Sequence, residues 1–459
     1  MIKDMTKGNI PKQLVNFSIP LILGNLLQLT YNAVDSIVVG KFSGTDALAA
    51  VGTANPVMNI VILGITGICI GASVLMSEFF GAGNYKDLKK EISTTLIFGL
   101  FFSLLVVILG LIFSKGILSL LGVPNEILGP ATLYLKIIFI AMPFTYLYNA
   151  VSAAMRSVGD SKTPIKFLAI AAILNGCLDF VFVGGLHMGV VGAALATDIA
   201  EACSAIFCII YIYKNVPLLR LTKSDIKMDK NLLKLTLQHG SITALQQSCQ
   251  PIGKLLIQGA INPLGVATIA AFNAVNRVDD FAFTPQQSIS NGMMTFIAQN
   301  RGANNQKRVK DGFKIGLCVE FCYWILICIV VLCLKEPIMK LFVSSGDTSM
   351  VNLGVHYLGI MAFFYIFPAF TNGIQGFFRG MGNMKITLVS TLIQISFRVI
   401  FVYVLVPHIG MISFAYASLI GWILMLAYEV PYYFIYKRKN DFLTDSNELE
   451  QNMQFQEQS

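Results

Sequence analysis

Residues 14–40 read LVNFSIPLILGNLLQLTYNAVDSIVVG, a run of 27 residues with one charged side chain, Asp35. At about 1.5 Å per residue, a helix of this length crosses the roughly 30 Å of hydrocarbon in a bilayer. A helix is favoured over a strand because lipid leaves unpaired backbone groups unsatisfied, and because the run shows no alternating pattern. Residues 14–40 therefore predict a membrane-spanning helix.

Eleven further runs have the same character. Their approximate limits are 48–79, 92–113, 130–155, 165–185, 189–213, 232–260, 266–298, 312–334, 350–378, 386–406 and 411–436. Of the 459 residues, 55% are hydrophobic and 13% are charged, whereas soluble domains contain about 25% charged residues. This composition excludes an ordinary soluble enzyme and a disordered chain. We expect an all-α integral membrane protein with twelve transmembrane helices.

Basic residues alternate between the connections. Twenty-five Lys and Arg residues lie in the N-terminal segment, in every second connection and at the end of the last span, and four lie in the opposite connections. The positive-inside rule places the basic side, and with it both termini, in the cytoplasm. We therefore expect a multi-pass protein of the cell (plasma) membrane. The net charge of +8 then reflects topology, and nucleic acid is not an expected partner.

The two halves of the chain are related. Residues 44–90 overlay 265–311 with 12 of 47 positions identical, and Asn149, Arg156, Gly159 and Lys162 match Asn372, Arg379, Gly382 and Lys385. Because each half has six spans, the copies share one orientation and form a parallel repeat. We predict a cytoplasmic segment at 1–13, an N-lobe at 14–213, an inter-lobe loop at 214–231, a C-lobe at 232–436 and a disordered tail at 437–459.

Asp35 is the first candidate for function, since ionisable groups inside a membrane are costly. Gln28, Tyr31, Asn32 and Asp35 follow three- and four-residue spacings, so they share one helix face. The alternative is a structural hydrogen bond near the outer interface. Pro20 removes a backbone donor and should bend this helix, as a static kink or as part of a switch.

Asn175 and Asp179 form a second candidate, one turn apart in the fifth span, with Thr197 and Asp198 as possible neighbours in the sixth. Two carboxylates, an amide oxygen and a hydroxyl could hold Na⁺, or one desolvated carboxyl could carry a proton. A network of structural helix–helix hydrogen bonds is the alternative. No other metal site is expected, because the nine cysteines lie in apolar runs without zinc spacing.

The second half carries a further charged set, consisting of Lys254, Arg277, Asp279, Asp280 and Arg398. These charges could neutralise one another in pairs or contact substrate. Glu201, Glu320 and Glu429 also lie within apolar runs and have no evident partner. There is no Walker motif, GxGxxG or HExxH, so transport would draw its energy from an ion gradient.

The sequence resembles the multidrug and toxic compound extrusion (MATE) family over residues 10–437. The resemblance rests on YNAVDS at 31–36, ALAAVG at 47–52, FGAG at 80–83, RSVGDSKTP at 156–164 and GAALAT at 192–197. It implies two six-helix lobes and efflux of organic, often cationic, compounds in exchange for H⁺ or Na⁺. It is most similar to the prokaryotic branch that resembles the DNA-damage-inducible transporters.

In that branch, the resemblance implies an ion-coupling site at Asp35, Asn175, Asp179 and Thr197 and a helix bend at Pro20. Gln28, Tyr31, Asn32 and Asn149 are the candidate cavity residues. Another branch has a carboxylate in the seventh helix, where this chain has Gln246 and its neighbours. The basic residues Lys254, Arg277 and Arg398 leave room for anionic or zwitterionic substrates.

We therefore expect an antiporter that is not an enzyme, needs no cofactor beyond H⁺ or Na⁺, contacts small organic substrates and membrane lipid, and acts as a monomer. A flippase for a lipid-linked sugar is the nearest alternative. A membrane transferase would need a paired catalytic motif, and the four His residues are scattered along the chain.

Overall fold

The computed structural model describes residues 2–342 and 348–457, and every regular element in these ranges is helical. The long helices are α1 (Ile10–Gly81), α2 (Tyr85–Leu120), α3 (Asn125–Ser157), α4 (Lys162–Asp179), α5 (Gly189–Asn215), α6 (Lys230–Ile261), α7 (Val266–Gly302), α8 (Gln306–Phe342), α9 (Thr348–Phe364), α10 (Ile366–Gly380), α11 (Met384–Ile409) and α12 (Ser413–Glu457). Four short turns complete them: η1 (Phe180–Gly185), η2 (Pro217–Leu219), η3 (Asn262–Leu264) and η4 (Gly410–Ile412).

The helices correspond to the twelve expected spans, with two differences. The first two spans are merged in α1, and the tenth is divided into α9 and α10, which meet at a bend of 43°. Eight stretches are long and apolar enough to cross a membrane, or nine if that bent pair is one span. One of them, Met384–Arg438, contains both α11 and α12, and α6 and α7 are more polar. The all-α fold of twelve spans is confirmed.

Gly44 is the point at which α1 reverses. Its φ of 85° is the break within α1, and the matching residue of the second half, Gly265, has a φ of 90° before α7. Side chains with a Cβ seldom adopt this left-handed region, whereas glycine does so readily. The repeat is therefore preserved in the backbone as well as in the sequence.

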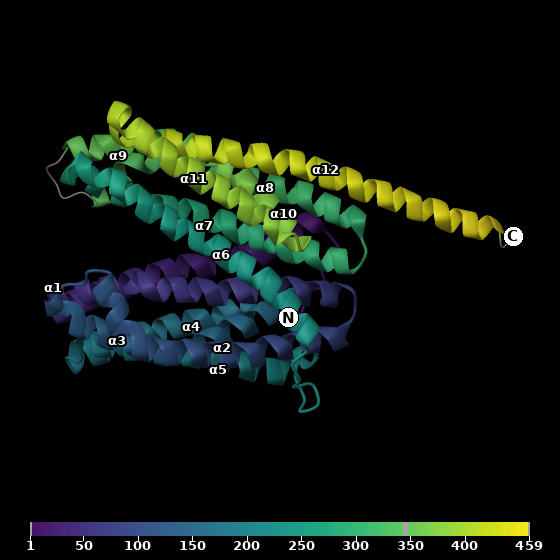
Figure 1. The fold of residues 1–459 in the computed structure, drawn as a ribbon, viewed down its shortest axis with the longest axis horizontal. Helices are drawn as coiled ribbons and strands as arrows, with labels where there is room; N and C mark the ends of the chain where they lie inside the picture. Colours follow the sequence, from purple (N-terminus) through teal and green to yellow (C-terminus); the bar gives the residue numbers. More distant parts are fainter. Residues whose placement is uncertain (1, 343–347, 458–459) are drawn as a thin grey trace.

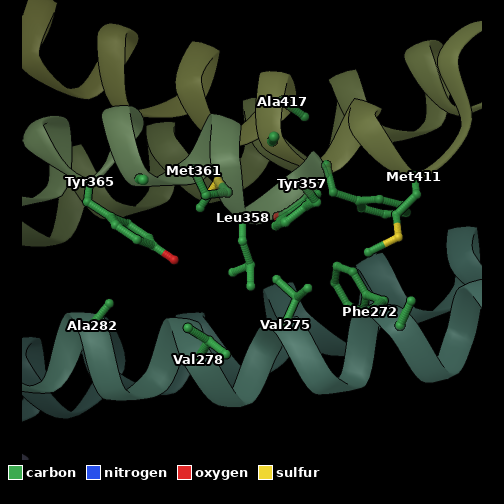
Figure 2. Packing of buried hydrophobic residues seen from close by; sticks show 14 of the residues in the cluster. Phe272, Val275, Val278, Ala282, Tyr357, Leu358, Met361, Tyr365, Met411 and Ala417 are labelled. Atoms are coloured by element: carbon green, nitrogen blue, oxygen red, sulfur yellow. The ribbon is translucent and has the colours of Figure 1, made fainter. Parts of the chain in front are cut away.

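The helices form two halves, α1–α5 and α6–α12 (Figure 1). Each half has its own apolar core. In the second half, Phe272, Val275 and Val278 of α7 pack against α9 and α12 through Leu358, Met361 and Ala417 (Figure 2). A corresponding cluster in the first half joins the middle of α1 to α3 and α5.

The halves contact each other closely at the end that carries the basic connections, here called the basic end. An added Cβ at Gly81 would collide with the backbone of Gln299, and one at Gly302 would collide with the backbone of Glu78. These two contacts are reciprocal, since Gln299 and Gly302 are the repeat partners of Glu78 and Gly81. Arg301 Nε also donates to Glu78 Oε1 at 3.2 Å. Small residues allow such close approach of membrane helices.

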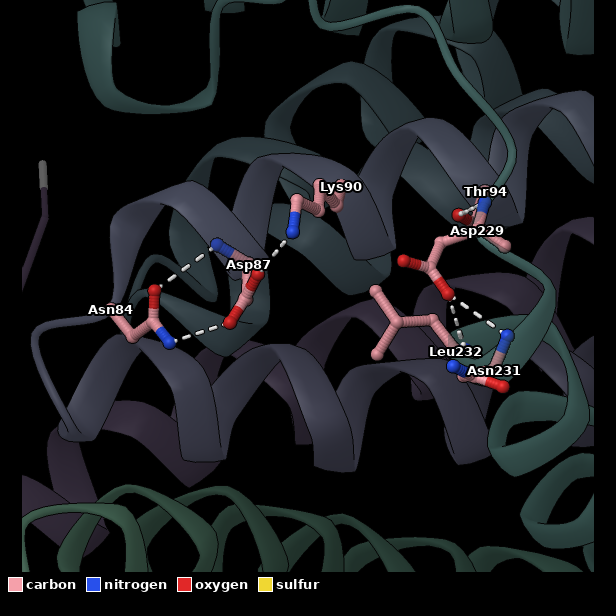
Figure 3. Close-up of polar contacts among 7 residues, drawn as sticks. All are labelled: Asn84, Asp87, Lys90, Thr94, Asp229, Asn231 and Leu232. Carbon is pink, nitrogen blue, oxygen red and sulfur yellow. Dashed lines mark hydrogen bonds and ion pairs between the residues drawn. The ribbon is translucent and has the colours of Figure 1, made fainter.

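The connection between α5 and α6 is docked on α2 at the basic end. The backbone N–H groups of Lys227 and Asp229 donate to Ser93 Oγ at 2.9 Å and Thr94 Oγ1 at 3.0 Å. Figure 3 shows Asp229 beside Thr94, where its carboxylate also caps the first turn of α6. In α2, Lys90 pairs with Asp87 at 2.8 Å (Figure 3). The start of α6 is thereby attached to the first half.

The C-terminal segment is helical, and the expectation that it is disordered stays a prediction. In the structure, α12 continues through 437–457 and projects beyond the bundle (Figure 1). These residues include no proline and no glycine, so nothing in the backbone interrupts the preceding helix.

Candidate functional site

A cavity of about 310 Å³ lies between the two halves. Its wall comes from α1, α3, α4 and α5 of the first half and from α6 and α7 of the second. Three predicted cavity residues, Gln28, Tyr31 and Asn149, line it. The side chain of the fourth, Asn32, lies outside the described residues.

Asp35 and Asp179 are brought together beside this cavity. Asp35 comes from the first arm of α1, and Asp179 is the last residue of α4, where the chain passes into the π-helical turn Phe180–Gly185. Their carboxyl groups lie close enough to interact electrostatically. In each, Oδ1 is buried and has no hydrogen-bond partner. Since a carboxylate has no donor, two neighbouring acids in a buried position favour a proton or another cation beside them.

Asn175 and Thr197 complete the cluster. Asn175 is 2% exposed and lies one turn before Asp179 in α4. With its amide nitrogen directed at Asp179, it donates to Oδ2 at 3.2 Å, and its oxygen accepts from the backbone N–H of Thr197 at 3.2 Å. Thr197 Oγ1 in turn donates to the carbonyl of Ala193 at 3.1 Å. The four predicted coupling residues therefore form one connected group, and both Asn175 and Thr197 reach the cavity wall.

Glu201 is a further acid of this site. It lines the cavity and accepts a hydrogen bond from Thr145 Oγ1 of α3. The sequence marked Glu201 as an acid in an apolar run without a partner, because Thr145 lies 56 positions away on another helix. Asp198, three residues before Glu201, has a buried Oδ1 without a hydrogen-bond partner. The N-lobe side of the cavity wall therefore carries one acid, Glu201, together with one base, Arg156 of α3.

The charged set predicted in the second half does not act as one group. Lys254 pairs with Asp280 at 2.8 Å in a half-exposed position. Asp279 is 5% exposed and accepts from the hydroxyl of Tyr365 at 2.5 Å. Arg277 is exposed, whereas Arg398 lines a second, smaller cavity. Adjacent residues of a helix point about 100° apart, which separates Asp280 from Asp279.

Two other features bear on the ion site. The backbone of α1 keeps helical angles at Pro20, and its break is at Gly44, so a switch at Pro20 stays a prediction. Among the described residues, no group of three or more His, Cys, Asp and Glu side chains could hold a metal ion. The oxygen atoms of the Asp35–Asp179 cluster suit a hard monovalent cation or a proton.

Comparison with known proteins adds the following. The MatE family model matches residues 20–181 and 243–404, one match in each half. The probable multidrug resistance protein YoeA of Bacillus subtilis is 30% identical over 350 residues, which are 75% of this chain and 76% of that protein. The multidrug export protein MepA of Staphylococcus saprophyticus is 24% identical over 376 residues, 82% of each chain.

A solved structure shows the same fold. It is the outward-facing conformation of a multidrug resistance MATE family transporter of the MOP superfamily, with a TM-score of 0.88 at 21% identity. The alignment covers 95% of this chain and 97% of that chain.

Proposed function

The chain belongs to the MatE family of transporters, and on this ground we propose that it is a secondary active antiporter that exports organic, often cationic, compounds in exchange for H⁺ or Na⁺. The observation that carries the proposal is the pairing of two neighbouring acids, Asp35 and Asp179, beside a cavity between the lobes. Two acids in one low-dielectric site attract a cation strongly. Assignment to the DNA-damage-inducible branch stays a prediction.

The proposed mechanism is alternating access. The structure has its lobes packed together at the basic end, so the cavity would exchange with the opposite side in this state. A proton or Na⁺ entering from that side neutralises the pair of acids. This weakens contacts to a cationic substrate and changes the packing of α1. The ion drives the cycle only if it binds the two conformations with different affinity.

The test uses the purified protein in liposomes, with ethidium export measured under an imposed pH gradient and, separately, under an imposed Na⁺ gradient. We expect one gradient to drive export, and Asp35→Asn and Asp179→Asn to abolish it while the protein stays folded. Asp46→Asn, which changes an exposed acid, is the matched control and should export normally. Full gradient-driven export by either of the first two variants would refute this coupling scheme.

We further propose that the protein acts as a monomer in the plasma membrane with its basic end in the cytoplasm. The bias of Lys and Arg between alternate connections supports this orientation. In intact cells, a cysteine at exposed Lys86 should react with a permeant maleimide and resist a charged, impermeant one. Equal reaction with both reagents would reverse the orientation.

A further inference from the structure

A second cavity of about 130 Å³ lies within the C-lobe. Its polar wall is built from glutamine, asparagine and threonine side chains together with two arginines, Arg379 and Arg398. Among the residues that the structure describes, no Asp, Glu or Lys lines it. At roughly 30 Å³ for each water molecule, it has room for about four waters, or for one small polar group and part of a ring.

Several polar atoms of this wall have no partner. Nε of Arg398 is buried without an acceptor, and the buried oxygens Gln394 Oε1 and Asn291 Oδ1 have no donor. Gln394 and Arg398 lie one turn apart on the same face of α11. Buried polar atoms are nearly always satisfied, so a concentration of unsatisfied ones in a cavity indicates a site for a polar ligand.

The two arginines lack direct counter-ions in the part of the chain that the structure describes. Arg379 is 7% exposed and donates to two neutral acceptors, Ser290 Oγ at 2.9 Å and the carbonyl of Gln375 at 3.4 Å. Asp279, whose charge reaches Arg398 only at longer range, is engaged by the Tyr365 hydroxyl. Glu429 is fully buried behind the wall and reaches Arg379 only through space. A guanidinium in such a place favours a bound carboxylate.

The cavity also has an aromatic side, and it shares part of its wall with the first cavity. Phe283 and Trp422 line it with their rings 5.9 Å apart, edge to face. Gln247, Gln287 and Asn291 line both cavities, so the two cavities adjoin, and a ligand that spans them reaches the N-lobe side of the first. That side carries Glu201.

We propose that the C-lobe cavity is a subsite for the carboxylate of zwitterionic aromatic substrates, with Arg398 as the residue that recognises it and the cationic group held on the Glu201 side. This substrate class rests on the proposed export function and extends it. Recognition of both charges would let the protein select molecules that a purely acidic cavity would hold less well.

Equilibrium binding tests the subsite independently of transport. The probes are rhodamine 110, a zwitterion with a free carboxylate, and rhodamine 123, its cationic methyl ester. Binding to the purified full-length protein is measured by fluorescence anisotropy at neutral pH. We expect the wild type to bind rhodamine 110 at least as tightly as the ester. Arg398→Gln should lower the affinity for rhodamine 110 at least tenfold and change the affinity for rhodamine 123 by less than twofold. Arg398→Lys should recover part of the loss.

Lys385→Gln is the matched control, because Lys385 is an exposed cation on the same helix. It should bind both dyes with the same affinity as the wild type. The subsite would be overturned if Arg398→Gln lost affinity equally for both dyes or lost it for neither. It would also be overturned if the wild type bound only the ester, or neither dye. If Arg398→Gln loses thermal stability, Arg398→Lys carries the comparison. Failure of gradient-driven export with intact dye selectivity would overturn the proposed function and leave the subsite standing.

Discussion

Glu201 is the side chain whose replacement separates substrate binding from ion coupling. It lines the main cavity and is held by Thr145, outside the Asp35–Asp179 pair. Glu201→Gln removes the charge and keeps the shape. We expect the affinity for rhodamine 123 to fall about tenfold, because one charge-assisted hydrogen bond typically contributes that much to a binding constant.

The comparison variant is Glu126→Gln, which neutralises an exposed acid at the start of α3 and should bind the dye normally. Measured dissociation constants that agree between wild type and Glu201→Gln would exclude Glu201 from the substrate site.

The sequence grouped some of the candidate residues and left others unconnected, because local spacing relates only residues of the same helix. Asn175 and Asp179 share a helix face, so their four-residue spacing was sufficient to group them. The partnership of Glu201 with Thr145 joins two helices and leaves no trace in local spacing. The C-lobe subsite is built largely of amides, which do not stand out in an apolar sequence as charges do.

Among the elements, α1 depends most on a single residue. Gly44→Ala places a Cβ in left-handed backbone and should cost about 1–2 kcal/mol of folding free energy. Thermal unfolding in detergent should show a lower midpoint. Gly52→Ala lies in the same helix with open space at its Cβ position and should be as stable as the wild type or slightly more stable. Equal midpoints for both variants would mean that the turn tolerates a side chain.

The connection between α5 and α6 should be sensitive to acid. The backbone N–H of Thr222 donates to Asp225 at 2.9 Å, and this bond, with help from the Thr222 hydroxyl and Lys89, lowers the pKa of Asp225 below its ordinary 3.8. Because the folded pKa is the lower one, the stabilisation is present above pH 3.8 and is lost as the pH falls through the folded value.

Hydrogen–deuterium exchange, corrected for intrinsic rates, should therefore show 217–229 protected at pH 6 and opening in strong acid. Asp225→Asn cannot titrate and should remove this acid dependence. A transition of the same size in the variant would assign it to other groups.

The helices themselves were largely readable from the sequence, since an apolar run long enough to span a bilayer has few alternatives. The reversal at Gly44 falls in the polar connection 41–47, which the sequence places between the first two spans. The bend between α9 and α10 was missed, and the turn after Asp179 gives no local signal either.

For the molecule as a whole, the contact at the basic end determines which side is closed. Gly81→Leu inserts a side chain where the backbone of Gln299 now lies, so the lobes must separate there. With spin labels at exposed Lys86 and Lys307 in a background without native cysteines, the inter-label distance should increase and export should be lost.

Gly302→Leu should have the same effect, because the contact is reciprocal. Ala82→Leu, one residue away and exposed, should retain the wild-type distance. Unchanged label distances in both glycine variants would show that this packing does not hold the closed state.

That reciprocal contact also bears on how such a chain could originate. Each half offers the same glycine to the same backbone position of the other half, which is the isologous geometry of a twofold dimer. A six-span ancestor with this glycine could already have closed upon a second copy of itself. Gene duplication and fusion through the 214–231 connection would then have freed the two copies to diverge, so that Glu201 lines the cavity wall of one copy and Arg398 lines that of the other.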